Sequence, residues 1–407
     1  MENSYAMLNG KLTDKTLQSL ELQKGEGAYL YDNEGKKYID LSSGLWNVNL
    51  GYNNQLNRNI KESISRILDN NLPYVDMTSY YHNIYDRTAK TLLDFVDDKT
   101  FKKVLFTNSG SESVELSLKI VNLIINSNKK ILSFSESYHG TYYGGMSLSG
   151  LTKVLANNHK VDFKTNLNKP IPQNKDQEEA FLNFVKNNVK EIGAIFIEPV
   201  IGSGGIKYAS LDFYNNLLMI CKRNNIIIVF DEIATGFYRT GNKFFFKKLD
   251  YSPDIVCMSK GLNNGTLPCG SVIINEKIND EIKDVKSKHM STQNGNILCQ
   301  VSMLETINFY NEVNQNLINN VNDIENITSE LCKRFHQDFR NIGAMVALPI
   351  ENKKIDQVLQ LLKDNGIICY RFITDGQSGL SLFPHVNIDM KLYKRAVKFV
   401  LKTISKY

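Results

Sequence analysis

The chain has 407 residues and a formal net charge of +5, with 42% hydrophobic and 22% charged residues. This length exceeds the usual size of one hydrophobic core, so we expect two domains or one elaborated domain. The charges form no long block of one sign, and we predict no nucleic-acid partner. No apolar stretch is long enough to span a bilayer, and the N-terminus lacks a signal-peptide pattern, so we expect a cytoplasmic protein without a membrane partner.

The cysteines indicate the same compartment. None of the six belongs to a Cys-x-x-Cys pair, and none has a histidine at metal-ligand spacing. We therefore expect reduced, mostly buried thiols and no metal site. The six are Cys221, Cys257, Cys269, Cys299, Cys332 and Cys369.

The first pattern along the chain alternates over residues 26–40 around an Asn-Glu-Gly turn and predicts a β-hairpin. Short apolar runs in the middle are rich in β-branched residues and predict strands, while residues 111–126 and 211–224 are long enough for crossover helices. From about residue 300 helical patterns dominate, with two short strands between them. The predicted strands are residues 130–135, 194–198, 226–231, 254–258, 271–274, 343–349 and 366–370.

This order of elements predicts an α/β architecture. Near-continuous apolar runs indicate strands that are covered on both faces, as in a mainly parallel sheet with helices on each side. The hairpin near one end and the helical region near the other predict a second, smaller α+β domain built from both termini. We place the N-terminal part of the small domain at residues 1–50, the large domain at 51–299 and the C-terminal part of the small domain at 300–407.

Asp231 ends the apolar run 226–230 and begins the segment Asp-Glu-Ile-Ala-Thr-Gly-Phe-Tyr-Arg-Thr-Gly. Parallel α/β sheets bind ligands at the carboxyl ends of their strands. A buried carboxylate is costly without a positive partner, and the protonated ring nitrogen of a pyridine cofactor would be such a partner. A cap on the following turn explains the aspartate equally well when it is considered alone.

Lys260 follows the next predicted strand, in the segment Asp-Ile-Val-Cys-Met-Ser-Lys-Gly-Leu. Partial burial would lower the pKa of its amine and provide a neutral nucleophile for imine formation. Most lysines at strand ends are solvated surface residues. The position of Lys260, about one βα unit beyond Asp231, favours a cleft that both side chains share.

Ser109, Gly110 and Ser111 lie in a loop that opens into a helical pattern. Backbone N–H groups at a helix start, together with a serine hydroxyl, form an anion site suited to a phosphate. A plain serine N-cap is the common alternative. The chain has no Gly-x-x-x-x-Gly-Lys-Ser/Thr segment and no Gly-x-Gly-x-x-Gly after its first strand, which disfavours nucleotide hydrolysis and a dehydrogenase.

Tyr138 and His139 follow the predicted strand 130–135, in the segment Glu-Ser-Tyr-His-Gly-Thr-Tyr-Tyr-Gly-Gly. An aromatic ring beside a phosphate site can stack on a flat heteroaromatic cofactor. His139 could act as a general base, although a hydrogen-bonded structural histidine is the more common outcome. We include both residues among the expected cofactor contacts.

Five motifs together resemble those of the class III pyridoxal-phosphate aminotransferases, the family of ω-amino acid, amine and ornithine transaminases. They occur in the family's order, and the similarity runs almost from end to end. The resemblance implies the α/β fold called fold type I, with a large cofactor-binding domain and a small α+β domain. The motifs are Ser-Gly-Ser-Glu-Ser-Val-Glu, Tyr-His-Gly, Glu-Pro-Val-Ile-Gly-Ser-Gly-Gly, the segment that begins at Asp231, and Ser-Lys-Gly-Leu.

The resemblance gives the residues of these motifs roles towards pyridoxal 5′-phosphate. Lys260 looks like the lysine that holds this cofactor as a Schiff base and shuttles a proton between the substrate and the cofactor. Asp231 looks like the partner of the ring nitrogen. Ile233 would pack beneath the ring, and Tyr138 would stack on it.

Further roles concern the phosphate and the neighbouring subunit. Gly110 and Ser111 resemble the family's phosphate cradle. Glu198 matches a glutamate that lies near the cofactor's 3′-oxygen and can interact with a mobile substrate-binding arginine. Thr292 falls where the family sends a threonine from the neighbouring subunit to the phosphate. The resemblance therefore implies a homodimer with shared active sites.

Departures from the family pattern concern the substrate. Acetylornithine-type members carry an arginine directly after Tyr-His-Gly, whereas this chain has Thr141. The segment around Trp46 resembles the ω-amine:pyruvate and diaminopelargonate branches, in which this tryptophan walls the substrate pocket. Leu45 stands where a second tryptophan is expected. Arg371 lies near where both branches place an arginine for the acceptor's carboxylate, although a solvated arginine on a small-domain strand is the alternative.

The resulting hypothesis is a ping-pong transamination between an amine or ω-amino donor and an oxo acceptor, both small molecules. Lys260 and Asp231 are its catalytic residues, and Trp46 and Arg371 its substrate contacts. A diaminopelargonate-type transaminase is an alternative within the family. A racemase, aminomutase or decarboxylase of the same fold would use the same lysine and aspartate, and a cofactor-retaining protein without turnover is an alternative from a different class.

Overall fold

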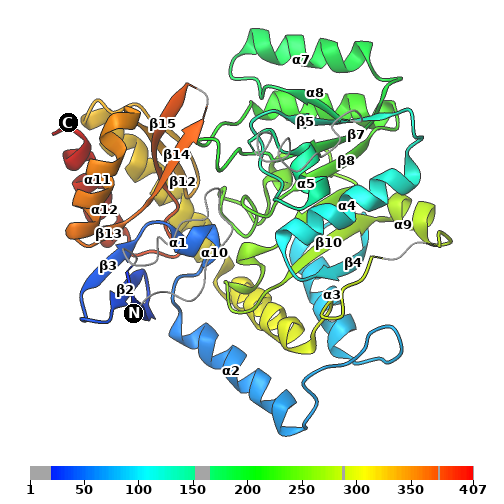
Figure 1. The fold of residues 1–407 in the computed structure, drawn as a ribbon, viewed down its shortest axis with the longest axis horizontal. Helices are drawn as coiled ribbons and strands as arrows, with labels where there is room; N and C mark the ends of the chain where they lie inside the picture. Colours follow the sequence, from blue (N-terminus) through cyan, green and yellow to red (C-terminus); the bar gives the residue numbers. More distant parts are fainter. Residues whose placement is uncertain (1–19, 152–165, 287–288, 375, 407) are drawn as a thin grey trace.

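The computed structural model describes residues 20–151, 166–286, 289–374 and 376–406 (Figure 1). A seven-stranded sheet forms the centre of the larger domain, in the order β4-β10-β9-β8-β7-β5-β6. The neighbouring pairs from β9 to β6 are parallel, whereas β10 is antiparallel to β9 and β4. The strands are β4 (Phe101–Thr107), β5 (Lys130–Phe134), β6 (Asn166–Lys169), β7 (Ile192–Ile197), β8 (Ile227–Asp231), β9 (Ile255–Met258) and β10 (Gly270–Asn275).

Helices bury this sheet on both faces. Alternate side chains of β8 pack in the hydrophobic cluster that contains α4 (Gly110–Ile124) and in the cluster that contains α8 (Leu211–Arg223). This two-sided burial explains the near-continuous apolar runs, and the predicted α/β fold with a mainly parallel sheet is confirmed. The other elements here are α2 (Asn54–Asp69), α3 (Ile84–Val96), α5 (Tyr143–Leu148), α7 (Lys175–Asn187), α9 (Glu276–Ile282) and the 3-10 turns η2 (Phe245–Lys248) and η3 (Lys260–Asn263).

Segments from both ends of the sequence meet in the smaller domain, where blue and orange ribbons lie together in Figure 1. β13 (Ile367–Ile368) pairs in parallel with β3 (Lys37–Asp40) and completes the sheet β1-β2-β3-β13. A second sheet has the order β11-β12-β15-β14. The remaining elements are β1 (Leu22–Glu26), β2 (Tyr29–Asp32), α1 (Ser43–Trp46), β11 (Arg340–Ile342), β12 (Met345–Pro349), α11 (Asn352–Asp364), β14 (Tyr370–Thr374), β15 (Gln377–Leu382) and α12 (Met390–Ile404).

The long helix α10 (Ile297–Arg334) connects the two domains. It packs against α2 and α3 and also against α12 and β11. The helix runs across the predicted domain boundary at 299/300 without a break. The predicted boundaries at 50/51 and 299/300 stay predictions.

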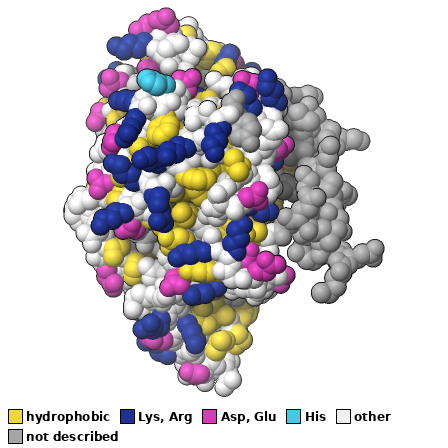
Figure 2. Space-filling model, turned by 90° about the vertical axis from the view of Figure 1, so that its left-hand side faces the viewer, with side chains coloured by type: hydrophobic (Ala, Val, Ile, Leu, Met, Phe, Trp, Pro, Cys, Tyr) yellow, Lys and Arg dark blue, Asp and Glu magenta, His cyan; other side chains and the backbone are white. Residues whose placement is uncertain are grey.

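The surface of the smaller domain is mixed in charge. Figure 2 shows Lys and Arg side chains spread over this face, with Asp and Glu side chains between them. This distribution agrees with the scattered charges of the sequence. None of the helices in the described ranges combines the length and the apolar character that crossing a membrane would require.

Asp254 directly precedes β9 and bonds to residues of the two strands beside it, β8 and β10. Its buried carboxylate accepts the backbone N–H of Ile228 at 2.8 Å, the side-chain amide of Asn275 at 2.8 Å and the ammonium of Lys222 at 2.9 Å. We expect Asp254→Ala to lower the free energy of unfolding by about 2–4 kcal/mol, because buried donors lose their acceptor. Urea unfolding followed by circular dichroism measures this loss.

A matched control is Asp250→Ala. The side chain of Asp250 is exposed, and the bond to Asn215 comes from the backbone N–H of Asp250, which the substitution keeps. This substitution should change the free energy of unfolding by less than about 0.5 kcal/mol. Equal losses for the two variants would contradict the role given to Asp254.

Candidate active site

Two neighbouring strands end at the candidate site. β8 ends at Asp231, and β9 is followed by Lys260, which begins η3. β8 and β9 are parallel, with Asp231 aligned to Cys257, so their carboxyl ends lie at the same edge of the sheet. Asp231 and Lys260 therefore follow one another at the ends of neighbouring strands, and the charge of Asp231 opposes the lowering of the Lys260 pKa by burial.

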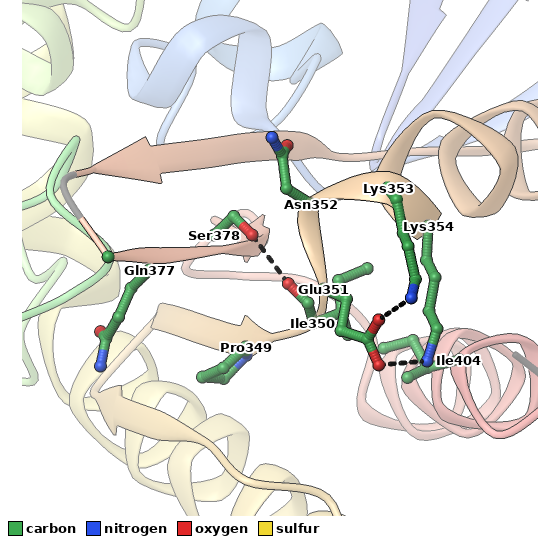
Figure 3. A pocket seen from close by; sticks show the side chains of 10 residues that line it. Pro349, Ile350, Glu351, Asn352, Lys353, Lys354, Gln377, Ser378 and Ile404 are labelled. Carbon is green, nitrogen blue, oxygen red and sulfur yellow. Dashed lines mark hydrogen bonds and ion pairs between the residues drawn. The ribbon is translucent and has the colours of Figure 1, made fainter.

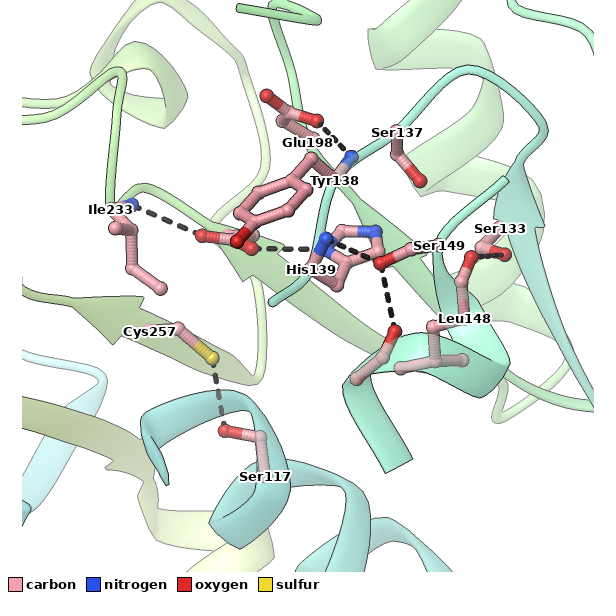
Figure 4. A network of polar contacts seen from close by, with 12 residues as sticks. Ser117, Ser133, Ser137, Tyr138, His139, Leu148, Ser149, Glu198, Ile233 and Cys257 are labelled. Atoms are coloured by element: carbon pink, nitrogen blue, oxygen red, sulfur yellow. Dashed lines mark hydrogen bonds and ion pairs between the residues drawn. The ribbon is translucent and has the colours of Figure 1, made fainter. Parts of the chain in front are cut away.

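The Asp231 carboxylate is buried and held at both oxygens. Oδ1 accepts the N–H of Ile233 at 3.1 Å, and Oδ2 lies 2.8 Å from Nδ1 of His139 (Figure 4). Because a carboxylate can only accept, Nδ1 donates to it. The backbone N–H of His139 in turn donates to Ser149 at 2.6 Å. Nε2 of His139 is buried and has no hydrogen-bond partner among the described residues.

The start of α4 lies beside Ile233. Ser109 is the N-cap of this helix, and the N–H groups of Gly110 and Ser111 have no acceptor in the part of the chain that the structure describes. A Cβ at Gly110 would lie 2.9 Å from Cδ1 of Ile233, and one at Gly140 would lie 2.5 Å from Oγ of Ser111. The first turn of α4 thus meets the loop after β5 and presents free donors suited to an anion.

Glu198 follows β7 and is also buried. Its carboxylate accepts the backbone N–H of Tyr138 at 2.8 Å and that of Gly202 at 3.0 Å. Burial raises the pKa of Glu198 to about 7; His139 opposes this shift, and the negative charge of Asp231 adds to it. Burial also raises the pKa of the Tyr138 phenol, and both carboxylates reinforce that shift. Near neutral pH, Glu198 can therefore hold a proton close to the tyrosine ring.

Lys260 adopts a left-handed backbone conformation, with a φ of +45°. Its Nζ lies 4.7 Å from the centroid of the Trp46 ring. Burial lowers the pKa of Lys260, whereas Asp231 and Glu198 oppose the shift and Arg239 adds to it. A lowered pKa increases the fraction of neutral amine, which is the nucleophilic form.

Apolar groups surround the indole of Trp46. Its ring packs on the ring of Phe383, with centroids 4.4 Å apart. A Cβ at Gly202 would lie 3.5 Å from both the indole Cζ3 and Cε of Met345. The indole Nε1 is buried and has no hydrogen-bond partner among the described residues. Trp46 therefore places a flat apolar wall beside Lys260 and has one unpaired donor among the described residues.

Thr292 lies outside this cluster of buried residues. It is exposed, and its carbonyl accepts the phenol of Tyr74 at 2.7 Å. It lines a groove of about 1400 Å³ together with exposed apolar side chains such as Met77, Leu123 and Met290. The same loop bonds to Asn108, next to the start of α4, through the side chain of Asn294.

The structure does not bring Arg371 into the cluster. Its guanidinium pairs with Asp356 of α11 at 2.7 Å, and both side chains are largely exposed. The next residue, Phe372, is buried and packs against Gly205, so Arg371 points to the opposite face of β14. The role of Arg371 in holding an acceptor carboxylate stays a prediction.

The residue-level interpretation of the sequence did not identify Arg239 as a site residue, although the residue lies in the motif that begins at Asp231. Its guanidinium is fully buried and donates to the carbonyl of Pro384 at 2.5 Å and to Oδ1 of Asn49. Burial lowers the pKa of Arg239 to about 10. The signal available in advance was its position within the motif that begins at Asp231.

Another cavity, of about 740 Å³, lies in the smaller domain between β12, α11, β15 and α12 (Figure 3). Its lysines, Lys353 and Lys354, pair with Glu351 at 2.9 and 2.7 Å. None of the residues lining this cavity belongs to the buried cluster around Asp231 and Lys260. It offers no chemistry comparable to that cluster.

The buried cluster fits a flat aromatic ring that carries a phosphate. The unpaired N–H groups at the start of α4 can receive the anion, and the buried carboxylate of Asp231 can receive a ring N–H. Ile233 and Tyr138 provide apolar and aromatic surfaces beside that carboxylate (Figure 4). Lys260 supplies an amine with a lowered pKa.

The chain belongs to the class III aminotransferases. The sequence model of the family described as "Aminotransferase class-III" matches residues 12–404. Acetylornithine aminotransferase of Lactococcus lactis is 30% identical over 371 residues, which cover 89% of this chain and 91% of that protein. Vanillin aminotransferase of Capsicum annuum is 29% identical over 379 residues, which cover 83% of this chain and 79% of that protein.

Solved structures share the fold. A transaminase from the marine bacterium Virgibacillus superposes with a TM-score of 0.87 at 24% identity, covering 97% of this chain and 95% of that one. An amine transaminase from an uncultivated Pseudomonas species superposes with a TM-score of 0.88 at 22% identity, covering 100% and 99%. The expected membership is therefore confirmed, and the chain is a pyridoxal-phosphate-dependent aminotransferase that transfers amino groups.

The raised pKa of Glu198 predicts that its contribution to the free energy of unfolding depends on pH. In the unfolded chain the Glu198 carboxyl loses this proton near 4.5, the ordinary pKa of a glutamate, whereas the folded chain keeps it until about 7. The folded state thus binds more protons in this window, and Glu198 makes the wild type less stable as pH rises through it. Relative to the wild type, cofactor-free Glu198→Gln should gain on the order of 3 kcal/mol between about pH 4.5 and about pH 7.5.

Urea unfolding of both cofactor-free proteins across this pH range measures the difference. Glu281→Gln, at an exposed position of α9, is the control. Its difference from the wild type in the free energy of unfolding should not change with pH. A difference for Glu198→Gln that does not change with pH would show that its carboxyl titrates normally.

Proposed function

We propose that this aminotransferase moves an amino group from an amine or ω-amino donor to an oxo acceptor by a ping-pong mechanism. Lys260 and Asp231 are the catalytic residues of this proposal. The observation that carries it is a lysine of lowered pKa and a buried aspartate at the ends of neighbouring parallel strands. Membership of the class supports the reaction type.

The residues that would hold the cofactor come from three segments. Ser109, Gly110 and Ser111 would receive the phosphate through the start of α4. Tyr138 and Ile233 would contact the faces of the ring. His139 would act through Asp231, by fixing its carboxylate with the 2.8 Å contact.

Bound pyridoxal phosphate supplies an electron sink for the charge that develops at the donor's reacting carbon. Lys260 Nζ, whose pKa burial lowers, would take the proton from that carbon and carry it between the substrate and the cofactor. Asp231 would accept a hydrogen bond from the ring N–H and so favour its protonated form. Glu198, which accepts the backbone N–H of Tyr138, would lie near the cofactor's 3′-oxygen.

The walls of the site favour an amine or ω-amino donor. Trp46 and Met345 meet beside Gly202, and Phe383 packs on the indole of Trp46. Thr141 stands where an acetylornithine-type pocket would have an arginine. Arg371 would have to leave Asp356 before it could hold an acceptor's carboxylate, and we retain that role as part of the proposal.

We also propose a homodimer with shared active sites. Thr292 is exposed beside a large groove lined by apolar side chains, which is the composition expected of a surface that a second copy covers. Its neighbours Ser291 and Asn294 bond to Asn108, close to the start of α4. The six cysteines are free thiols, which supports a reducing, cytoplasmic compartment.

Initial rates with amine and ω-amino donors and several α-oxoacids test the proposed reaction. A ping-pong transfer gives parallel double-reciprocal lines, together with equal amounts of donor-derived carbonyl product and new amino acid. Recovery of the donor unchanged, racemised or decarboxylated would instead indicate one of the other reactions of this fold.

Lys260→Ala should lower the rate by about 10²–10⁴-fold or more, because the proton acceptor is lost. Borohydride treatment of the wild type followed by peptide mass spectrometry should place the reduced cofactor on the peptide that contains Lys260. Lys243→Ala is the matched control, since burial also lowers the pKa of Lys243 and its ammonium lies 4.9 Å from the ring centroid of Phe95. Unchanged activity in Lys260→Ala would overturn the assignment.

Hybrid dimers test whether the sites are shared. Thr292→Ala alone should weaken cofactor binding, and Lys260→Ala alone should be inactive. In a hybrid of the two variants, one site has its own Lys260 and the other subunit's Thr292, so half of the sites should regain wild-type affinity and activity. A mixture no better than Thr292→Ala alone would mean that Thr292 serves its own chain.

A further inference from the structure

The turn that carries Trp46 has an unfavourable backbone. Ser43, Leu45 and Trp46 have φ values of +47°, +66° and +63°, and Gly44 has +54°. Residues with a Cβ rarely adopt this left-handed region, because the Cβ approaches the carbonyl oxygen. Three such residues in one turn persist only when surrounding contacts hold them.

Asp40 supplies contacts of this kind from inside the turn. Its carboxylate is fully buried, and Oδ1 accepts both the backbone N–H of Ser42 at 2.7 Å and its hydroxyl at 2.6 Å. Oδ2 accepts the N–H of Gly44 at 3.0 Å and the phenol of Tyr52 at 2.7 Å. Nε2 of His385 lies 3.8 Å from the same oxygen.

Tyr52 is itself fixed in place. Its ring packs against Gly25, where an added Cβ would lie only 2.5 Å from Cγ of Tyr52. Its backbone N–H and carbonyl both bond to Gly27. Burial raises the pKa of Tyr52, and Asp40 reinforces this shift, so the phenol keeps its proton and donates it. Asp40 is thus anchored to a rigid neighbour as well as to the turn.

The far end of the turn meets the active site. The hydroxyl of Ser43 donates to the carbonyl of Phe383 at 2.5 Å, and the ring of Phe383 packs on the indole of Trp46. The indole in turn lies 4.7 Å from Nζ of Lys260. A loosening of the turn would therefore move an indole that lies beside Lys260 and whose buried N–H has no partner among the described residues.

We infer that Asp40 and Tyr52 form a latch that holds the left-handed turn 43–46, and that Asp40 is a positioning residue for the substrate-facing wall made by Trp46. The latch follows from contacts alone, whereas its effect on substrate rests on the proposed function of the site. Neither residue touches the reacting groups. Their effect is to keep the indole in place when substrate binds.

Trp46 is the only tryptophan of the chain, so its fluorescence reports the state of this turn directly. Asp40→Asn replaces Oδ2 by an amide that cannot accept from Gly44 and Tyr52. In cofactor-free protein we expect the emission to shift to longer wavelength and iodide quenching to increase. In holoenzyme the KM for the donor should rise about five- to twentyfold with kcat little changed.

Tyr52→Phe is the milder second variant, because it removes only one hydrogen bond to Asp40. It should shift the emission in the same direction by a smaller amount. It also keeps the test decisive if Asp40→Asn fails to fold, which the far-ultraviolet circular dichroism would reveal.

The chain contains a matched control in the neighbouring hairpin. Asp32 accepts two backbone N–H groups, from Glu34 and Lys36, and the phenol of Tyr38 at 2.9 Å. Asp32→Asn and Tyr38→Phe thus remove chemically equivalent bonds from the same sheet without touching the turn 43–46. Both should leave the Trp46 emission, its quenching and the KM at wild-type values.

Shifts in Asp40→Asn and Tyr52→Phe without shifts in the two control variants support the latch. Unchanged emission in Asp40→Asn and Tyr52→Phe would overturn it, and so would equal shifts in all four variants. The fluorescence needs neither cofactor nor turnover, so it separates the two proposals. If the variants show the expected shifts but the wild type transfers no amino group, the latch is supported and the proposed reaction is contradicted.

Discussion

The site depends on a buried carboxylate at the end of a strand that is covered on both faces. Asp231 could not remain there without donors, and His139 and Ile233 provide them at 2.8 and 3.1 Å. Those donors come from the loop after β5 and from the turn that follows β8. The requirement to satisfy one carboxylate therefore brings the loop that carries Tyr138 and His139 to the end of β8, and Ile233 in turn lies against the start of α4.

Much of the larger domain was predictable because its strands have a simple environment. β5, β7, β8, β9 and β10 are buried on both faces, and their apolar runs mark them within one or two residues. β4 and β6 were missed for the opposite reason. They lie at the two edges of the sheet, and Lys102, Lys103 and Asn166 interrupt the apolar pattern where a face is only partly covered.

The candidate site was predictable in its parts but not in its supports. Asp231, Lys260 and the Ser109–Ser111 loop have local patterns that suggest chemistry. Asp40 lies in no motif that suggests chemistry. Arg239 stands in the motif that begins at Asp231, but its partners, the carbonyl of Pro384 and Asn49, are 145 and 190 residues away in the sequence. Thr292 was found through the family resemblance alone, and nothing in its own segment of sequence indicates a partner subunit.

The parallel pairing of β3 with β13 has a consequence for synthesis on the ribosome. Asp40 aligns with Ile368, so about 330 residues separate the partners. At a synthesis rate of roughly 5–20 residues per second, one edge of β3 stays unpaired for on the order of 20–60 seconds before β13 is made. Until then β3 presents unpaired backbone groups to other nascent chains. Lysines in and beside these strands, Lys24, Lys36 and Lys37, discourage wrong pairing.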